Sequence, residues 1–441
     1  MGQTARTLDV AVVGAGAAGL SAATALAAAG CAVEVLEARP RIGGRILTSS
    51  DPDLAWPIEL GAEFIHGRAP ATAELLARAG MLAIDTVGTR LTVRDSAPRP
   101  REDIFSGVRE LMGRVSSLAE DDLSVDEFLS REARDPKLAE ACAHARRMAE
   151  GFDAADPARA SVRAIAHEWE SMDGGNARPA AGYGVLMAQL ARELAAGHGS
   201  VRLETEVDAI DWTQDDVRVE GHSPAGRFVS VARRALLTVP VSILQLAPSA
   251  PGAIGFTPPL TEKAIALRGI ALGPVLKVIL RFGRAFWEAI DGGRLRHTGF
   301  LHAPDAAFPT FWTALPARVP LLTAWMGGPR AERMRGAGRD ALVTSALQSL
   351  ESLFGPAERC TQELAAAYVQ DWQQDPYARG AYSYITVGGL GAPDALARPL
   401  HDRLYFAGEA TSSADAGTVE AALQSGRRAA REILESLRGS A

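Results

Sequence analysis

The amino-acid sequence predicts an α/β protein with two domains, one of them assembled from segments that lie far apart in the chain. Three observations lead to this fold class. The chain has 441 residues, which is too long for one simple hydrophobic core. Residues 8–37 read as a strand, a glycine-rich turn, an alanine-rich helix and a second strand. Strand-like segments then return over 201–240 and at 402–408, directly before the last helix.

Composition and charge limit the classes of protein to which the chain can belong. Hydrophobic residues make up 47% of the chain and charged residues 22%, as in ordinary soluble proteins. The net charge of −7 argues against nucleic-acid binding, because no basic excess is available to neutralise phosphates. No apolar run is long enough to span a membrane. Three scattered cysteines without CxxC spacing predict a reducing, cytoplasmic location, and the eight histidines show no metal-ligand spacing.

The first βαβ unit carries a phosphate-binding pattern. Gly14, Gly16 and Gly19 form GxGxxG after a strand and before a helix, and Glu37 ends the next strand. Such glycines allow a tight turn, close approach to a pyrophosphate and close helix packing, while the acidic residue accepts ribose hydroxyls. The context predicts dinucleotide binding rather than a merely structural turn. The motif alone leaves open whether the dinucleotide is NAD or FAD.

The rest of the chain alternates between helical and strand-like regions. Apolar residues recur at helical spacing over about 103–170, and strand-like runs follow over 201–240. A second β-rich region includes VLKVILRF at 275–282, and helical material follows at 331–354. The last helix is predicted over about 417–437.

The loop after the first unit resembles a known family. Its sequence, EARPRIGGRI, is similar to that of the flavin-dependent amine oxidases, which include monoamine oxidases, polyamine oxidases and lysine-specific histone demethylases. The resemblance implies FAD as the cofactor, with Glu37 on the adenosine ribose. It also implies that Arg39 and Arg45 lie near the adenosine and pyrophosphate, and that Gly43–Gly44 let the backbone pass close. A solvated loop is the alternative for the two arginines.

Two further segments extend the resemblance. ELGAEFIHG at 59–67 is similar to the family loop that passes the flavin ring, which makes Gly61, Ala62 and Glu63 candidate cofactor contacts. His66 matches a histidine of many polyamine oxidases, with a surface-loop imidazole as the alternative. The segment from Gly182 resembles the return to the flavin domain, where Val207 would hold the adenine through its backbone.

The most specific match is FAGEATSSADAGTVEAALQSG at 406–426. In the family this strand, loop and helix hold the ribityl chain and pyrophosphate, which implies these roles for Gly408 and Glu409. A helix that begins near Thr418 and Val419 would point its unpaired N–H groups at the flavin, where its dipole favours negative charge. We therefore expect Thr418 and Val419 beside the cofactor.

Lys277 is the most informative single residue. It lies in VLKVILRF, whose two faces are both apolar, and a buried lysine is costly unless its ammonium finds a partner or water. The pattern favours a buried lysine over one on an exposed strand face. By resemblance, Lys277 is the family lysine that holds a water next to flavin N5.

Trp372 and Tyr382 flank the stretch WQQDPYARGAY. They could be core aromatics on either side of a turn, or two walls of a substrate pocket. The resemblance implies the pocket, because family members place an aromatic at the Tyr382 position before the flavin and the demethylases add the tryptophan. Pro376 and Gly380 would turn the chain between them. Aromatic faces there would orient a neutral amine and favour a developing iminium cation.

The sequence departs from the monoamine oxidases at two positions, and these departures indicate a branch of the family. Ala381 stands where monoamine oxidases carry the cysteine that binds FAD covalently, so the resemblance implies non-covalent FAD. Thr418 stands where they carry a second tyrosine. Both departures favour the polyamine-oxidase and demethylase branch.

The fold class is therefore an α/β protein with a discontinuous, Rossmann-like FAD-binding domain and an α+β substrate-binding domain. The predicted FAD-binding domain comprises 1–85, 195–255 and 400–441. The predicted substrate-binding domain comprises 86–194 and 256–399.

The resemblance implies an amine oxidase that transfers a hydride from the carbon next to nitrogen to flavin N5, with imine hydrolysis and reduction of O2 to H2O2. Its partners would be a small-molecule amine and O2, with a homodimer left open. Glu63, Glu168 and Glu170 could meet a second ammonium group or be solvated. An L-amino-acid oxidase or related flavin oxidase or desaturase stays an alternative, and a non-catalytic flavoprotein is the third.

Overall fold

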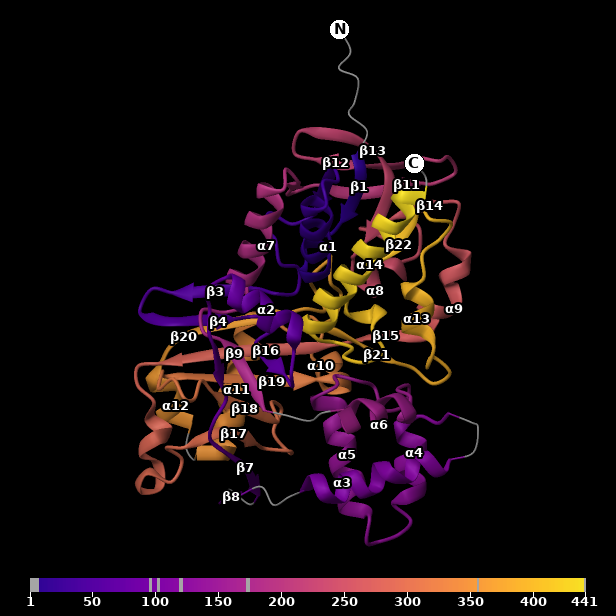
Figure 1. Ribbon diagram of the computed structural model, residues 1–441. Helices are drawn as coiled ribbons and strands as arrows, with labels where there is room; N and C mark the ends of the chain where they lie inside the picture. The colour runs from indigo at the N-terminus through magenta and orange to yellow at the C-terminus, as the bar shows by residue number, and fades with distance from the viewer. Residues whose placement is uncertain are drawn as a thin grey trace.

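The computed structural model describes residues 8–94, 97–100, 104–118, 122–171, 175–354 and 357–439 (Figure 1). Two large sheets and a group of helices make up this part of the chain. The sheet that contains the N-terminal unit lies at one end of Figure 1, and the helical group lies at the other.

The N-terminal unit folds as predicted. It consists of β1 (Leu8–Val13), α1 (Ala17–Ala28) and β2 (Val33–Leu36). The two strands pair in parallel, with Val10 opposite Val33. Their apolar residues are buried on both faces, which is typical of a parallel sheet covered on both sides.

The first sheet collects strands from three distant parts of the sequence. Its order, within the described residues, is β10 (Ser200–Arg202), β2, β1, β13 (Gly226–Leu237), β12 (Val217–Ser223), β11 (Glu206–Asp211) and β14 (Gly255–Thr257), and β22 (Leu404–Phe406) also pairs with β13. Both neighbours of β1, namely β2 and β13, run parallel to it. This arrangement is a discontinuous α/β domain of Rossmann type.

Two helices cover α1. They are α14 (Val419–Gly439) and α7 (Gly184–Ala196), and residues of both share a core with α1 and β1. Helix α7 therefore packs with the first sheet, although the predicted boundary of that domain falls at residue 195. The division into domains by residue stays a prediction.

The second sheet has, among the described residues, the order β20 (Leu364–Asp371), β16 (Val275–Phe282), β19 (Leu321–Gly327), β18 (Thr310–Thr313), β17 (Thr298–His302), β7 (Thr89–Arg94) and β8 (Ala97–Pro100). Strand β16 coincides with the predicted VLKVILRF segment. Leu276, Val278 and Leu280 share a core with α11 (Arg339–Phe354), while Lys277 points to the other face. Helix α10 (Gly328–Arg333) follows β19 directly.

A helical group packs near the second sheet (Figure 1). It comprises α3 (Ile104–Gly113), η1 (Arg114–Ser117), α4 (Val125–Glu132), α5 (Ala139–Gly151) and α6 (Val162–Ser171). Buried residues from all of these elements form one core. Ser124 caps α4 in a capping box with Glu127, which satisfies two backbone donors at the helix start. The predicted helical region over 103–170 is confirmed within the described residues.

Smaller elements join the two sheets. Short sheets form from β3 (Thr48–Asp51) with β4 (Leu54–Glu59), from β5 (Ile65–His66) with β9 (Asn176–Pro179) and β6 (Ala83–Asp85), and from β15 (Ile270–Gly273) with β21 (Tyr382–Ile385). The remaining helices are α2 (Pro70–Arg78), α8 (Val241–Leu244), η2 (Thr261–Lys263), α9 (Ala264–Arg268), η3 (Phe286–Gly293), α12 (Ala357–Glu363), α13 (Ala392–Ala397) and η4 (Glu409–Thr411).

Across the described ranges, none of the helices contains a stretch that is both long and apolar enough to cross a membrane.

Candidate functional site

A cavity of about 1440 Å³ runs from the glycine turn of the first sheet to the second sheet and the helical group. Ordinary small-molecule pockets hold roughly 300–1000 Å³, so this cavity has room for a large cofactor and a second molecule. All the predicted site residues except Gly19 line it. The structure therefore brings together residues that are spread from position 14 to position 419 of the sequence.

The glycine turn opens into this cavity at Gly16. Gly14 has φ +107°, which favours glycine, and a Cβ on Gly19 would lie 2.0 Å from the Gly14 carbonyl oxygen. Gly19 therefore allows close packing of α1 against the turn. A Cβ on Gly16 would meet no atom within 4 Å, so this position borders open space at the start of α1. Thr238 Oγ1 donates to the Val13 carbonyl oxygen at 2.8 Å and holds the turn from β13.

The carboxylate of Glu37 is buried at the end of β2. Its Oε2 accepts from the Ala15 N–H at 2.7 Å, and its Oε1 accepts from the Arg39 N–H at 3.0 Å. Each carboxylate oxygen can accept a second hydrogen bond, and Glu37 also lines the cavity. This geometry fits an acidic residue that accepts from a ribose hydroxyl.

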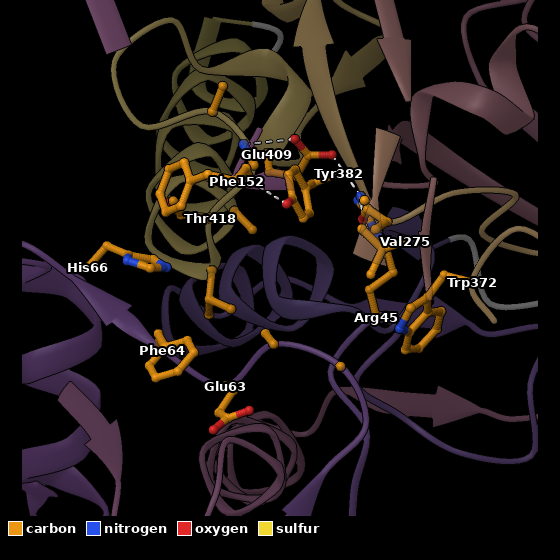
Figure 2. Close-up of a pocket in the computed structure, with 18 of the residues that line it drawn as sticks. Arg45, Glu63, Phe64, His66, Phe152, Val275, Trp372, Tyr382, Glu409 and Thr418 are labelled. Atoms are coloured by element: carbon orange, nitrogen blue, oxygen red, sulfur yellow. Dashed lines mark hydrogen bonds and ion pairs between the residues drawn. The ribbon is translucent and has the colours of Figure 1, made fainter. Parts of the chain in front are cut away.

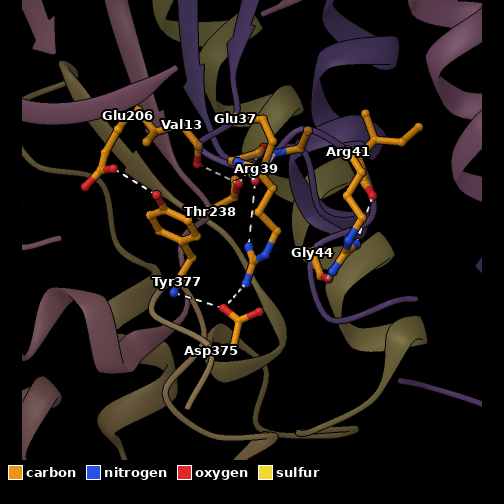
Figure 3. Close-up of polar contacts among 12 residues, drawn as sticks. Val13, Glu37, Arg39, Arg41, Gly44, Glu206, Thr238, Asp375 and Tyr377 are labelled. Atoms are coloured by element: carbon orange, nitrogen blue, oxygen red, sulfur yellow. Dashed lines mark hydrogen bonds and ion pairs between the residues drawn. The ribbon is translucent and has the colours of Figure 1, made fainter. Parts of the chain in front are cut away.

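Arg39 joins the loop after β2 to the loop after β20 (Figure 3). Its Nη2 donates to Asp375 Oδ1 at 2.5 Å, and its guanidinium lies 5.3 Å from the centre of the Tyr377 ring. Tyr377 in turn donates its hydroxyl to Glu206 Oε2 at 2.9 Å, next to Val207 at the cavity wall. These side-chain contacts close the predicted adenosine end of the site. The sequence pattern does not reveal them.

Gly43 and Gly44 cross the glycine turn. The Gly43 N–H donates to the Ala15 carbonyl oxygen at 2.8 Å, and both glycines have positive φ angles. A Cβ on Gly44 would approach the Gly16 Cα to 3.4 Å. The close crossing of two backbones explains why glycines stand at these positions.

Arg45 and Glu409 tie the cofactor loops together. Arg45 Nη1 donates to Glu409 Oε1 at 2.8 Å and to the Ala381 carbonyl oxygen at 2.7 Å. The other carboxylate oxygen of Glu409 accepts from the Gly417 N–H at 3.0 Å. Next to it, Gly408 borders open space, because a Cβ there would meet no atom within 4 Å.

The N-terminus of α14 faces the same cavity. Thr418 Oγ1 accepts from the Ala421 N–H at 3.0 Å, so Thr418 caps the helix that begins at Val419. Gly417 packs on the ring of Tyr382, where a Cβ would lie 3.3 Å from ring carbon Cδ2. Thr418 and Val419 both line the cavity, as does the first turn of the helix.

Lys277 is buried, with a relative exposure of 2%, and its ammonium is paired. Its Nζ donates to Glu63 Oε2 at 2.7 Å and to the Gly61 carbonyl oxygen at 3.2 Å, and it lies 5.6 Å from the Trp312 ring centre. The predicted burial of Lys277 is confirmed. Its position beside a flavin stays a prediction.

Glu63 also accepts from two further donors. Arg178 Nε donates to Oε1 at 2.8 Å, and Trp312 Nε1 donates to the same oxygen at 2.9 Å. Burial alone would raise the pKa of Glu63, but the neighbouring Lys277 and Arg178 cations lower it to about 2. The nearby Glu59 behaves oppositely, because burial raises its pKa to about 7. The side chain of Glu63 is therefore an ionised partner of two cations.

Trp372 and Tyr382 both line the cavity but are held differently (Figure 2). Tyr382 donates its hydroxyl to the Phe152 carbonyl oxygen, while Trp372 Nε1 donates to the Leu60 carbonyl oxygen at 3.2 Å. Gly380 donates its N–H to the Trp372 carbonyl oxygen at 2.9 Å, so the stretch between the two aromatics folds back on itself. In Figure 2, Trp372 lies on the side of Arg45, and Tyr382 faces Phe152 and Thr418.

His66 lies across the cavity from these residues (Figure 2). Its Nδ1 is 2.9 Å from Asn176 Oδ1, and its ring centre is 6.0 Å from Phe64 and 5.9 Å from Phe152. Burial lowers the pKa of His66, so the neutral imidazole is favoured. The structure thus places His66 in the cavity wall next to two aromatics. Gly61 and Ala62 precede it on the same lining loop.

Two carboxyl groups lie beside Tyr382. Asp153 accepts from Trp169 Nε1 at 3.1 Å; burial raises its pKa well above the usual range, and the Glu168 carboxylate adds to the shift. Burial, together with the Glu409 and Asp415 carboxylates, raises the pKa of Glu168 to about 7. Burial raises the pKa of the Tyr382 hydroxyl, and both carboxyl groups add to the shift. Glu168 and Glu170 line the cavity, as the polyamine alternative requires.

Some residues of the site have no clear signal in the sequence. Arg178 lies on β9, and only the pairing of β9 with β5 brings it to Glu63. Trp312 and Trp325 lie on β18 and β19, and Phe64 and Phe152 lie in loops. An arginine in an otherwise uncharged strand was the one available signal for Arg178.

Glu206, Asp208 and His222 form a cluster whose possible ligand atoms lie within 4.8 Å of one another. His222 Nδ1 lies 3.0 Å from Asp208 Oδ2, and Glu206 accepts from Tyr377. These hydrogen bonds account for the arrangement, and we assign no metal to it.

The parallel sheet, the glycine turn and the cavity beyond it define a protein of the dinucleotide-binding class. Within this class, residues 17–434 match the family described as flavin containing amine oxidoreductase. The chain belongs to this family, which implies a flavin cofactor and an activity on amines.

Curated relatives include enzymes of two kinds. The chain is 28% identical to lysine-specific histone demethylase 1 homolog 3 of Arabidopsis thaliana over 97% of its own length, but it spans 30% of that protein. It is also 28% identical to polyamine oxidase 2 of the same plant, of which it spans 88%.

Solved structures share the fold. A putrescine oxidase bound to putrescine has a TM-score of 0.79 at 22% identity, with 97% of this chain and 99% of that chain covered. Cyclohexylamine oxidase from Brevibacterium oxydans has a TM-score of 0.80 at 23% identity, with 98% and 100% covered. The predicted α/β fold class is confirmed.

Proposed function

We propose that this chain is an FAD-dependent oxidase of amines that binds its cofactor without a covalent bond. The observation that carries the proposal is the single cavity that joins the glycine turn to a buried, paired Lys277 and an aromatic wall. When bound, FAD accepts the hydride equivalent from the carbon next to the amine nitrogen and passes the electrons to O2, which becomes H2O2. Water then hydrolyses the imine.

The geometry supports an assignment of the residues that would hold FAD. Open space at Gly16, at the N-terminus of α1, would give the pyrophosphate room against the backbone, and open space at Gly408 would do the same for the ribityl chain. Glu37 would accept from the adenosine ribose, and Val207 would contact the adenine. Val419, at the start of α14, would donate its N–H toward the flavin. Ala381 offers no nucleophile for a covalent link.

The chain's own groups would bind and orient the amine. Tyr382, Phe152 and Phe64 would exclude water, and their faces would favour a developing positive charge. The raised pKa of Glu168 lets it take a proton from an arriving ammonium near neutral pH. Lys277, held by Glu63, would contribute a fixed ammonium and position a water.

Anaerobic mixing of the purified holoprotein with amines tests the proposal. The panel contains spermine, an N-acetylated polyamine, a simple monoamine and an L-amino acid, and the visible absorbance of the flavin is the readout. Bleaching by amines supports the proposal, and bleaching by L-amino acids alone supports the amino-acid oxidase. A flavin that only dithionite reduces would favour a non-catalytic flavoprotein. Acid precipitation that releases all the flavin supports non-covalent binding.

O2 as the electron acceptor, a homodimer and a cytoplasmic location stay predictions. So do the roles of His66 and Trp372 as groups that touch the substrate.

A further inference from the structure

One face of the second sheet forms a floor of the cavity. Along this face the register runs from Lys277 to Trp325, then to Thr310, and then to His302. A second row includes Trp312 and Phe300 and ends at Arg90 on β7. Each of these residues lines the cavity.

The middle of this floor is aromatic. The ring centres of Trp312 and Trp325 lie 5.7 Å apart, and those of Trp312 and Phe300 lie 6.1 Å apart. The ammonium of Lys277 lies over Trp312 at one end, and the guanidinium of Arg90 lies 5.3 Å from the centre of the Phe300 ring at the other. Three strand spacings of roughly 4.8 Å separate Lys277 from His302, which is about 14 Å. A substrate that reaches across this floor is therefore long.

The far end of the cavity carries positive charge. Arg90 lies on β7, on the side of the sheet remote from Lys277, and Arg330 lies on α10 next to the loop after β17. Both line the cavity, and so does Arg109 on α3. Arg330 Nη1 donates to the carbonyl oxygens of Pro304 and Ala306 at 3.0 and 2.7 Å, which fixes its position without neutralising it. None of these three arginines is seen in a salt bridge with a carboxylate of the described residues. Several arginines around one aperture produce a field that attracts anions.

The end of the cavity next to Tyr382 carries a carboxyl group. Glu168 lines the cavity together with Tyr382, where the proposed function puts the reacting amine. The cavity thus has a carboxyl group, Glu168, near the amine position and an arginine, Arg90, at the end of the floor remote from Lys277. A dication long enough to span the floor would put its second ammonium beside Arg90.

We propose that the cavity is built for an amine that carries an oxyanion, a carboxylate or phosphate, at the end remote from the oxidised carbon. Arg90 and Arg109 then determine specificity by pairing with this anion, while the aromatic floor contacts the chain between the two groups. The inference rests on the proposed oxidation of amines and names its substrate class. An α-amino acid, whose carboxylate adjoins the amine, does not reach the arginines.

The test compares four amines of equal length on the holoenzyme: 12-aminododecanoic acid, 12-aminododecyl phosphate, 1,12-diaminododecane and dodecylamine. The readout is the second-order rate of anaerobic flavin reduction. We expect an anionic amine to react about tenfold faster than dodecylamine, the order expected for one charge-assisted hydrogen bond, and the diamine to react more slowly. The carboxylate and phosphate arms identify which oxyanion fits.

Variants connect the preference to the arginines. Arg90→Gln and Arg109→Gln, singly and together, should remove the advantage of the anionic amines over dodecylamine. Arg333→Gln is the matched control, because Arg333 is an exposed arginine on α10 that does not line the cavity. Thermal melting of each variant verifies its folding.

A second readout does not depend on turnover. Calorimetric binding of octanoate and octyl phosphate, with octyltrimethylammonium as the cationic counterpart, should favour the anions and weaken in the double variant. Equal or faster reduction by the diamine, or an anion preference that survives both substitutions, overturns the inference while the proposed function stands. If no amine reduces the flavin but octanoate binding still depends on Arg90 and Arg109, the anion site stands and the proposed function fails. If no amine reduces the flavin and octanoate binding does not depend on Arg90 and Arg109, the inference and the proposed function are both overturned.

Discussion

Glu63 is the residue on which the buried charges of the site depend. It is ionised because two cations and an indole N–H surround it. Among the described residues, the salt bridges of Lys277 and Arg178 are both formed with Glu63. Lys277 would be a costly buried charge without it, since an unpaired ammonium in a dry interior is strongly destabilised. A carboxylate that the family resemblance marks as a cofactor contact therefore acts through its side chain on the lysine.

The substitution Glu63→Gln should destabilise the protein by about 3–5 kcal/mol, because it leaves Lys277 and Arg178 without their shared anion. Lys277→Met should cost less, since Glu63 keeps Arg178. Urea unfolding of both single variants and the double variant gives the coupling. If the losses of unfolding free energy in the two single variants add up to the loss in the double variant, the pairing of Glu63 with Lys277 does not contribute to stability.

Two substitutions of Tyr382 can separate the effect of its aromatic ring on flavin reduction from the effect of its hydroxyl. Tyr382→Phe keeps the aromatic face and loses only the hydrogen bond to the Phe152 carbonyl oxygen, so we expect flavin reduction to remain within about threefold. Tyr382→Leu removes the face and should slow reduction by about tenfold, the order of a desolvated cation–π contact. Stopped-flow reduction with a saturating amine measures both. Equal losses would assign the effect to the hydroxyl.

At the scale of elements, the glycine turn and α1 form half of the cofactor cradle. Gly16 has φ −79° and ψ −175°, a conformation open to any residue, and only empty space faces it. Gly16→Leu should therefore fold normally yet fill the space meant for the pyrophosphate. We expect flavin content, measured by absorbance, to fall about tenfold or more without loss of thermal stability of the apoprotein.

Gly19, in the same turn motif, should respond differently from Gly16 because a Cβ there would have no free space. Gly19→Ala would place a Cβ 2.0 Å from the Gly14 carbonyl oxygen and should lower the stability of the apoprotein itself. Gly439→Ala, at the exposed end of α14 with free space, is the control that should change neither quantity. A Gly16→Leu protein that retains its flavin would contradict the proposed position of the pyrophosphate.

Elements with local signals could be predicted from the sequence. The unit over 8–36, strand β16 and helix α14 follow from hydrophobic period, glycine position and capping. Lys277 was predictable as buried because both faces of its strand are apolar. Arg178 was not, because its burial depends on β9 pairing with a strand more than a hundred residues earlier. The charge distribution of the cavity also depends on side chains from four elements, β7, α3, α10 and α6, which no local pattern connects.

At the scale of the whole molecule, the cavity passes between the two sheets and the helical group. Its lining comes from nearly the full length of the chain, so cofactor binding should hold these parts together. Such a cavity also buries carboxyl groups that would be solvated in the unfolded chain. These groups make the stability of the fold depend on pH.

Glu59 and Glu168 determine the sign of this dependence. Burial raises each pKa from the ordinary value of 4.5 to about 7, so between these values the folded state binds more protons than the unfolded state. The free energy of unfolding should therefore fall as the pH rises from about 4.5 to 7, by an amount on the order of 1–3 kcal/mol for the nearly dry Glu59. Glu63, whose pKa is lowered to about 2, acts in the opposite sense and loses its contribution only as the pH falls below 4.5 toward 2.

Urea unfolding of the holoprotein between pH 5 and pH 8 measures this slope. Glu59→Gln replaces a carboxyl group that is mostly protonated below pH 7 by a neutral group of the same shape, which can still accept from the Tyr183 N–H and from Thr48. We expect the variant to lose part of the slope and to be more stable than the parent at pH 8. Glu193→Gln, a partly exposed carboxylate on α7, should leave the slope unchanged. A parent protein whose stability rises over this range would mean that Glu59 is ionised in the fold, paired with the cations that now hold Glu63.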